Sequence, residues 1–230
     1  MTSDSRLASI NESKRRVLIT GGGGDLAKEL ARQFEIAGYS ALAPNRQEMN
    51  VDEPESIRSY FSGIEKLDLL INNAAILRDG PFLRLEEDDW EAVVRTNLTG
   101  AFRCTREALP LLLKSGSGHI INIGSFSALH PPPGQAAYAA AKAGLIGFTQ
   151  SIAREFGGNN VRANCVLPGF LETKMSRPAW ERNHDEILSA HCLGRLNRIE
   201  DAARFMVFLD SMPGVSGQVF QLDSRIGPWI

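Results

Sequence analysis

The chain has 230 residues, enough for one large domain or two small ones, and 43% of them are hydrophobic, which supplies a core. A net charge of −2 gives no electrostatic reason to expect a nucleic acid or an anionic membrane as a partner. No apolar stretch is long enough to span a bilayer, no secretory signal is visible, and three cysteines without paired spacing favour a cytoplasmic protein with reduced thiols.

Apolar runs rich in β-branched residues alternate with helical patterns along the chain. In order, we predict a strand at 17–20, a helix with Leu26, Leu30 and Phe34 on one face, strands at 40–43 and 67–71, a helix at 90–113, a strand at 119–123, a helix at 135–156, and strands at 161–167 and 218–222. Few residues separate Arg46 from the segment 50–52, so the crossover helix there is predicted to be missing or reduced to a turn.

Alternating strands and helices imply parallel βαβ units with right-handed crossovers. No repeat or compositional break marks a linker, so we expect a flexible tail at 1–15 followed by one domain at 16–230. The predicted fold class is α/β, with a single doubly wound parallel sheet of the Rossmann type and helices on both faces. Such a sheet binds ligands at the carboxyl ends of its strands.

Four glycines, Gly21 to Gly24, follow the first predicted strand and precede a helix. Glycines let the backbone approach a ligand closely, and a helix N-terminus offers free N–H groups and a positive dipole end that suit a pyrophosphate. A plain tight turn is the alternative interpretation. Asp25 would repel a phosphate, so we expect its carboxylate to cap the helix instead.

The second predicted strand ends at Asn45 and Arg46, where no acidic residue is available for the ribose 2′-OH of NAD. Arg46 could meet the 2′-phosphate of NADP, so NADP(H) is favoured over NAD(H). Alternatively, Arg46 is an ordinary surface charge. The four histidines show no metal-ligand spacing, and no metal site is expected.

Tyr138 and Lys142 are separated by three alanines, which favour a helix and would place the two side chains on one face. Taken alone, the pair fits a partly exposed helix with two polar tips. A tyrosine with a pKa near 10 is a poor acid–base group, and an adjacent ammonium favours its phenolate and lowers that pKa. The pair would therefore serve acid–base chemistry only if the rest of the chain brings something to it on which it can act.

These landmarks together resemble the short-chain dehydrogenase/reductase family from Val17 to about Asp223. The glycine turn is similar to TGxxxGxG, although Asp25 and Ala27 replace two of its glycines, and 72–75 resembles NNAG with Ala75 in place of glycine. Ser125 precedes Tyr138 by the usual thirteen residues. The resemblance implies that Asn97, Ser125, Tyr138 and Lys142 are catalytic, with Asn97 holding a water that relays protons to Lys142 and Ser125 binding the substrate oxygen. A helix-interior bond for Asn97 and a strand-end cap for Ser125 are the alternatives.

The resemblance also implies which residues bind the cofactor. They are Gly21, Gly23, Gly24, Leu26, Asn45, Arg46, Asn50, Val51, Asn73, Ala74, Ala75, Tyr138, Lys142, Pro168, Gly169, Leu171 and Thr173.

The segment 134–144 is similar to GQxxYxxAKAG of the 3-oxoacyl-[acyl-carrier-protein] reductases, so a 3-oxoacyl thioester is the leading substrate. Reduction of another alcohol, sugar or ketone, or a regulatory protein that binds NADP(H) without turnover, are the alternatives. The segment 170–193 would form a lid, whose apolar residues line a pocket and whose arginines meet an acidic carrier, or else form helix core and a solvated face. The expected substrate residues are Ser125, Phe126, Ser127, Gln135, Tyr138 and Trp180.

Members of the resembled family pair helices into dimers or tetramers, so a homo-oligomer is expected, with the helices at 90–113 and 135–156 as the candidate interface. An acyl carrier protein is a further candidate partner. No nucleic acid or membrane partner is expected.

Overall fold

The computed structural model describes residues 14–227, and within that range one parallel sheet contains six strands. The strands are β1 (Arg16–Ile19), β2 (Ser40–Leu42), β3 (Leu69–Asn72), β4 (His119–Ile123), β5 (Arg162–Leu167) and β6 (Val219–Gln221). Their order is β2-β1-β3-β4-β5-β6, and every neighbouring pair is parallel. The chain therefore changes direction across the sheet between β1 and β3, and the predicted doubly wound α/β fold is confirmed.

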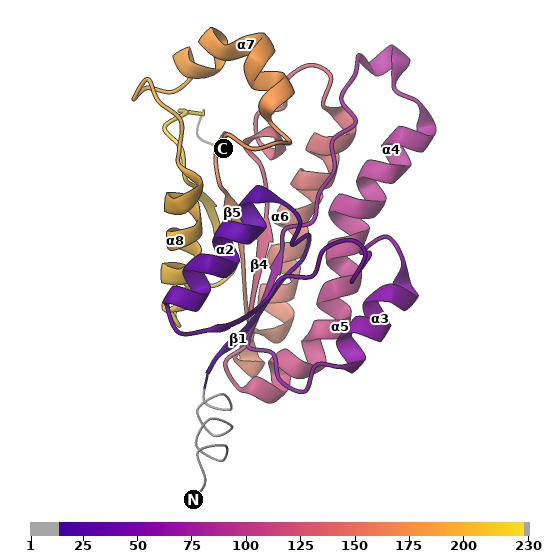
Figure 1. Ribbon diagram of the computed structural model, residues 1–230, viewed down its shortest axis with the longest axis vertical. Helices are drawn as coiled ribbons and strands as arrows, with labels where there is room; N and C mark the ends of the chain where they lie inside the picture. The colour runs from indigo at the N-terminus through magenta and orange to yellow at the C-terminus, as the bar shows by residue number, and fades with distance from the viewer. Residues whose placement is uncertain (1–13, 228–230) are drawn as a thin grey trace, which may run out of the picture.

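Helices cover both faces of this sheet (Figure 1). They are α2 (Asp25–Ile36), α3 (Pro54–Ser62), α4 (Glu87–Val94), α5 (Gly100–Ser115), α6 (Ala136–Phe156), α7 (Arg177–Ser189) and α8 (Ile199–Asp210). A π-helical turn, η2 (Arg95–Thr99), joins α4 to α5, so the single helix predicted at 90–113 is two α-helices with a wider turn between them. Helices α2 and α8 lie together on one face, and α3, α5 and α6 cover the other.

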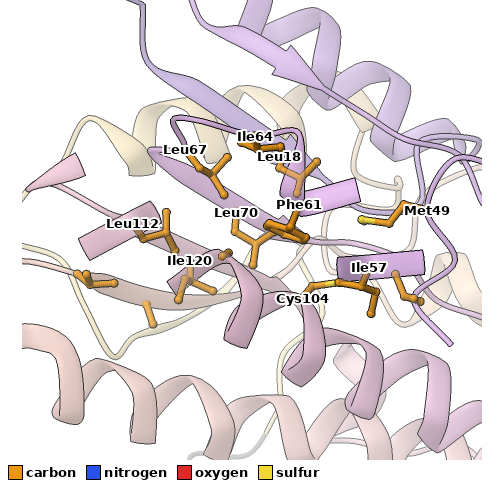
Figure 2. Packing of buried hydrophobic residues seen from close by; sticks show 14 residues of the cluster. Leu18, Met49, Ile57, Phe61, Ile64, Leu67, Leu70, Cys104, Leu112 and Ile120 are labelled. Carbon is orange, nitrogen blue, oxygen red and sulfur yellow. The ribbon is translucent and has the colours of Figure 1, made fainter. Parts of the chain in front are cut away.

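The two faces are built by strand alternation, because successive side chains of a strand point to opposite sides of a sheet. Leu18 of β1 packs with Leu70 of β3 and Leu112 of α5 on one face, as Figure 2 shows. Val17 and Ile19 point to the other face and join the cluster that contains residues of α2 and α8. All of these side chains are fully buried, so β1 is sandwiched between helices on both sides.

Helix α3 corrects the prediction that the crossover between the second and third strands lacks a helix. The helix begins at Pro54, a residue suited to the first helical position because its fixed φ and missing N–H cost nothing there. Ile57 and Phe61 are its buried residues and pack into the core that Figure 2 shows. With only two buried positions in nine residues, the helix leaves a weak hydrophobic period in the sequence.

A buried polar network lies at the end of the sheet away from the ligand-binding edge. Asp210, the last residue of α8, accepts hydrogen bonds from Arg15, Tyr39, His119 and Arg162 at 2.7–3.3 Å. Arg15 falls in the predicted flexible tail, yet it is bound in this network. Residues 1–13 of that tail lie outside the described residues.

This network makes the stability of the fold depend on pH. Burial lowers the pKa of His119 from 6.5 to about 4, so the folded protein keeps this ring neutral where the unfolded chain protonates it. The contribution of His119 to the free energy of unfolding is therefore fully present above pH 6.5 and is lost as the pH falls toward 4. It amounts to on the order of 3 kcal/mol. Burial opposes ionisation of Asp210, but the hydrogen bond from His119 and the charge of Arg15 outweigh it and lower the pKa to about 2, which extends the loss to lower pH.

We expect the urea midpoint of unfolding to fall steadily between pH 6.5 and 4. The exposed His184 is the matched control, and His184→Gln should show the same fall. A midpoint that does not change over this range would contradict the assignment of a neutral, buried His119.

The described part of the chain offers few other features for membranes, metals or redox chemistry. Between residues 14 and 227, no helix is long and apolar enough to cross a bilayer, and no three His, Cys, Asp or Glu side chains are grouped as metal ligands. Cys104 and Cys165 are buried, and burial raises the pKa of their thiols to about 12 and about 11. These two thiols therefore stay protonated at neutral pH.

Candidate active site

A cavity of about 1130 Å³ opens at the carboxyl ends of the strands. The residues that follow β1, β3, β4 and β5 line it, among them Gly21, Asn73, Ser125 and Pro168. This is the edge where doubly wound sheets bind ligands. The cavity also receives most of the residues that the sequence predicts for the cofactor and the substrate.

The glycine turn after β1 is shaped by close backbone contacts. Gly21 has a φ of +74°, and a Cβ on Gly22 would lie 1.9 Å from the carbonyl oxygen of Ala43. Only glycine fits these two positions without a shift of the backbone. A Cβ on Gly23 or Gly24 would make only ordinary contacts, at 4.0 Å to Asn45 and 3.4 Å to Gly21, and both glycines line the cavity.

The first turn of α2 leaves its N–H groups available to a ligand. Within residues 14–227, no side chain caps this helix, and the first backbone amide bonded back along the chain is that of Lys28, to Gly24. Such a turn, with the positive end of the helix dipole, fits a pyrophosphate. The residues present therefore fit a dinucleotide cofactor.

The prediction that Asp25 caps α2 is wrong. Its carboxylate instead accepts a hydrogen bond from the backbone N–H of Lys174 at 2.8 Å. Lys174 belongs to the segment between β5 and α7, so Asp25 connects the glycine turn to that segment. The bond turns the carboxylate toward the segment between β5 and α7 instead of the free amides of α2, which explains how the turn tolerates an acidic residue.

The segment after β3 is attached to the glycine turn through Thr20. The hydroxyl of Thr20 accepts from the N–H groups of Asn73 and Ala74 at 3.0 and 2.9 Å, and its carbonyl accepts from the Asn73 side chain at 3.0 Å. A Cβ on Gly21 would lie 2.9 Å from the Cα of Ala74. Asn73, Ala74 and Ala75 all line the cavity.

Arg46 lies at the edge of the cavity, with 70% of its side chain exposed. It forms an ion pair with Asp52 at 3.0 Å. Asn50 and Val51 also line the cavity, whereas Asn45 does not. The Asn45 side chain accepts from the N–H groups of residues 47 and 48 and so stabilises the turn that presents Arg46.

Asn97 is buried within the π turn η2, and its side chain lies outside the cavity lining. Its amide oxygen accepts from the N–H of Ile76 at 2.8 Å, and its amide nitrogen donates to the carbonyl of Ile76 at 3.0 Å. The Asn97 side chain therefore makes the same pair of bonds to the backbone of Ile76 that a residue of a neighbouring strand would make. Ile76 itself lines the cavity, which links Asn97 to the site.

Ser125, Tyr138 and Lys142 line the cavity together. Ser125 follows β4, and its Oγ accepts from the N–H of Ser127 at 3.1 Å. Tyr138 and Lys142 lie one turn apart on α6, as predicted, and the Lys142 ammonium is 5.6 Å from the centre of the Tyr138 ring. Lys142 is buried and donates to the carbonyl of Ile123 at 2.6 Å.

The pKa of Tyr138 differs from the sequence prediction. Burial raises this pKa to about 12, while the Ser125 hydroxyl acts in the opposite direction. Burial also lowers the pKa of Lys142 to about 8. The prediction that Lys142 lowers the pKa of Tyr138 is therefore wrong here, because desolvation of the phenol is the main cause of the shift and Lys142 is not among its causes.

The loop after β5 turns at Gly169, which has a φ of +89°. Pro168, Gly169, Leu171 and Thr173, which belong to the predicted cofactor set, all line the cavity. The carbonyl of Pro168 accepts from the Asn197 side chain at 2.9 Å, which connects this loop to the segment before α8.

Among the predicted substrate residues, Phe126, Ser127 and Gln135 line the cavity and Trp180 does not. The Trp180 ring packs against Phe170 at 5.9 Å and His184 at 4.2 Å between ring centres. Helix α7 thus directs the Trp180 ring toward Phe170 and His184, and other residues of the helix line the cavity.

Asp79 and Arg225 are among the charged residues of the cavity that sequence reasoning missed. Asp79 accepts from Gln135 Nε2 at 2.7 Å, and Arg225 covers the Phe126 ring at 3.8 Å. Arg225 follows a strand, and this position in the sequence was the signal that could have placed it at the cavity. Asp79 stands in a loop with no pattern around it.

Comparison with known proteins agrees with this geometry. A family model described as enoyl-(acyl carrier protein) reductase matches residues 9–224. Because that match and those of curated relatives cover most of the chain, the protein belongs to the short-chain dehydrogenase/reductase family and is an enzyme of that family.

The similar relatives carry a more particular name. The 3-oxoacyl-[acyl-carrier-protein] reductase FabG of Thermotoga maritima is 34% identical over 236 residues, which cover 91% of this chain and 96% of the relative. FabG of Aquifex aeolicus is 41% identical over 85% of this chain and 79% of its own. The 3-oxoacyl-[acyl-carrier-protein] reductase of Synechocystis is 40% identical, with 81% and 76% covered.

Proposed function

We propose that the protein reduces a 3-oxoacyl thioester to the 3-hydroxyacyl thioester with NADPH. The observation that carries this proposal is the convergence of Ser125, Tyr138 and Lys142 on the cavity that the glycine turn also lines. The names of the relatives support the thioester substrate. The implied setting is cytoplasmic fatty acid synthesis, with an acyl carrier protein delivering the substrate to a homo-oligomer.

The bound nicotinamide would supply the hydride that reduces the carbonyl carbon. Tyr138 would supply the proton for the carbonyl oxygen, since a pKa of about 12 keeps its phenol protonated at neutral pH. Ser125 Oγ accepts from Ser127 N and is hydrogen-bonded to the Tyr138 side chain, and its proton would be directed at the same oxygen once a substrate lies between the two hydroxyls. Two donors directed at one oxygen would stabilise the charge that develops there.

Lys142 would act after the proton has left Tyr138. With a pKa of about 8, most Lys142 side chains are protonated at neutral pH. Its bond to Ile123 uses one of three N–H donors, so two remain for the cofactor ribose or a water. The nearby positive charge would stabilise the tyrosinate formed by proton donation.

Asn97 would fix the position of Ile76, which lines the cavity beside these groups. Each of its amide atoms makes one bond to Ile76 and keeps one further bonding position. A water bound there would relay protons toward Lys142, as the family resemblance implies.

The test follows nicotinamide absorbance with NADPH or NADH and either an acetoacetyl or a crotonyl thioester. We expect rapid oxidation of NADPH with the acetoacetyl thioester and little with the crotonyl thioester. Oxidation with the crotonyl thioester alone would replace the proposal with the enoyl reduction that the family model's description names. Binding of NADPH without turnover of either thioester would favour a regulatory protein.

Arg46 should determine the choice of cofactor. Arg46→Ala is expected to raise the dissociation constant of NADPH roughly tenfold, because a charge-assisted bond to the 2′-phosphate is lost. The constant for NADH should not change. Fluorescence titration with both cofactors checks this, and Arg58→Ala, in α3 and outside the cavity lining, is the control. An equal effect on both cofactors would refute the assignment.

A further inference from the structure

Arg225 brings a positive charge to the part of the cavity beside Ser125. It follows β6 and lines the cavity. Its guanidinium carbon lies 3.8 Å from the centre of the Phe126 ring, and Phe126 is the next residue after Ser125. The contact is a cation–π interaction, which holds the guanidinium against this wall.

A second contact, with Asp223, fixes the orientation of the guanidinium. Asp223, whose side chain is fully buried, accepts from Arg225 Nε at 2.6 Å and also binds its Nη2. The other oxygen of Asp223 accepts from Gln221 Nε2 at 2.8 Å and from the backbone N–H of Arg225 at 3.2 Å. Asp223 is thus anchored in the protein and orients the arginine.

One edge of the guanidinium is left for a ligand. No partner of Arg225 Nη1 is found among residues 14–227, and 16% of this side chain is exposed. The Nη1 group carries two N–H donors and no acceptor. A buried or half-buried donor without a partner favours a ligand oxygen over a hydrocarbon, because an alkyl chain would desolvate it without a replacement bond.

The lid helix gives the cavity further polar character. Helix α7 lines it with Ala179, Arg182, Asn183, Glu186 and Ile187, and none of its residues is buried. Arg182 and Glu186 carry charges, and Asn183, whose backbone is not helical (φ −132°, ψ 31°), kinks α7 between them. These polar groups are poorly suited to cover a long alkyl chain.

We propose that Arg225 is a specificity-determining residue that selects 3-oxoacyl groups ending in a carboxylate over groups ending in a neutral or alkyl terminus. The inference rests on the proposed reduction of 3-oxoacyl thioesters, and it replaces the alkyl-ended acyl groups of fatty acid synthesis with groups that end in a carboxylate. Asp223 orients the guanidinium, Phe126 supports its face, and Nη1 binds the carboxylate. A guanidinium–carboxylate bond is among the stronger polar contacts that a protein makes.

The experiment compares two N-acetylcysteamine thioesters with the same acyl skeleton, that of 3-oxoadipate with a free terminal carboxylate and that of its terminal methyl ester. The wild-type enzyme should have the higher kcat/KM for the free acid. Arg225→Met should lower the ratio of the two values about tenfold or more, and Arg225→Lys should keep part of it, since it keeps the charge but loses the planar fork. Fluorescence titration of NADPH checks that each variant is folded.

Arg58→Met is the matched control, because Arg58 also forms an ion pair with an acidic side chain but lies on α3 outside the cavity lining. It should leave the ratio unchanged. Preference of the wild type for the methyl ester, or an unchanged ratio in Arg225→Met, would overturn the role of Arg225 and leave the proposed function intact. Turnover of neither thioester, nor of the acetoacetyl thioester, would overturn both.

Discussion

Replacing Tyr138 with phenylalanine should reduce kcat for the acetoacetyl thioester by about a thousandfold or more. The change removes one oxygen, and with it the only phenol that residues 14–227 bring to the cavity, while the ring keeps its place on α6. Proton transfer by a positioned side chain contributes about 10²–10⁴ to a rate, and we expect a value in the upper part of this range. Stopped-flow or steady-state oxidation of NADPH measures the effect.

Cofactor binding separates this chemical effect from a structural one. The dissociation constant of NADPH should change by less than about threefold in Tyr138→Phe, because the glycine turn and the loop after β5 are untouched. Tyr60→Phe is the matched control, since Tyr60 lies on α3 and outside the cavity lining. Activity near that of the wild type in Tyr138→Phe would rule out this tyrosine as the proton donor.

Removing the carboxylate of Asp210 should have the largest effect on stability. Asp210→Ala leaves His119, Arg162 and Tyr39 without their shared acceptor in a buried site, at a cost of about 3–5 kcal/mol. Because native domains are stable by only about 5–15 kcal/mol, this substitution should unfold much of the protein under mild conditions. Urea denaturation followed by circular dichroism gives the free energy of unfolding.

Asp201→Ala supplies the comparison, because Asp201 lies on the same helix and pairs with Arg204 at the surface. Exposed ion pairs contribute little, so this variant should lose about 1 kcal/mol or less. Equal losses in the two variants would show that the polar network around Asp210 contributes no more than a surface pair.

The sequence predicted the parts of the fold that carry strong hydrophobic periods. Each of the six strands was located, because β1, β3, β4 and β5 are buried on both faces and stand out as apolar runs. Helix α3 was missed because its polar start and few buried positions resemble a turn. The π turn within the predicted helix at 90–113 could not be predicted either, since an extra residue in one helical turn barely alters the pattern.

The site was predictable where spacing alone brings residues together. The interval from Tyr138 to Lys142 fixes one helical turn, and the strand ends bring Gly21 and Ser125 to one edge. The partner of Asp25 and the place of Arg225 depend on long-range packing, which no local pattern encodes. The sign of the tyrosine pKa shift likewise depends on burial that spacing does not report.

The π turn at 95–99 also restricts how the length of this chain can vary during evolution. A π turn holds one residue more than an α turn, so losing a single residue there would restore a regular helix. Everything on one side of the deletion would then rotate by about 100° relative to the other side. Either Asn97 would turn away from Ile76, or the buried face of α5 would turn toward solvent. Gaps in this stretch should therefore be rare among homologues that keep this pair of bonds, even though the neighbouring loop at 77–86 carries no such restriction of register.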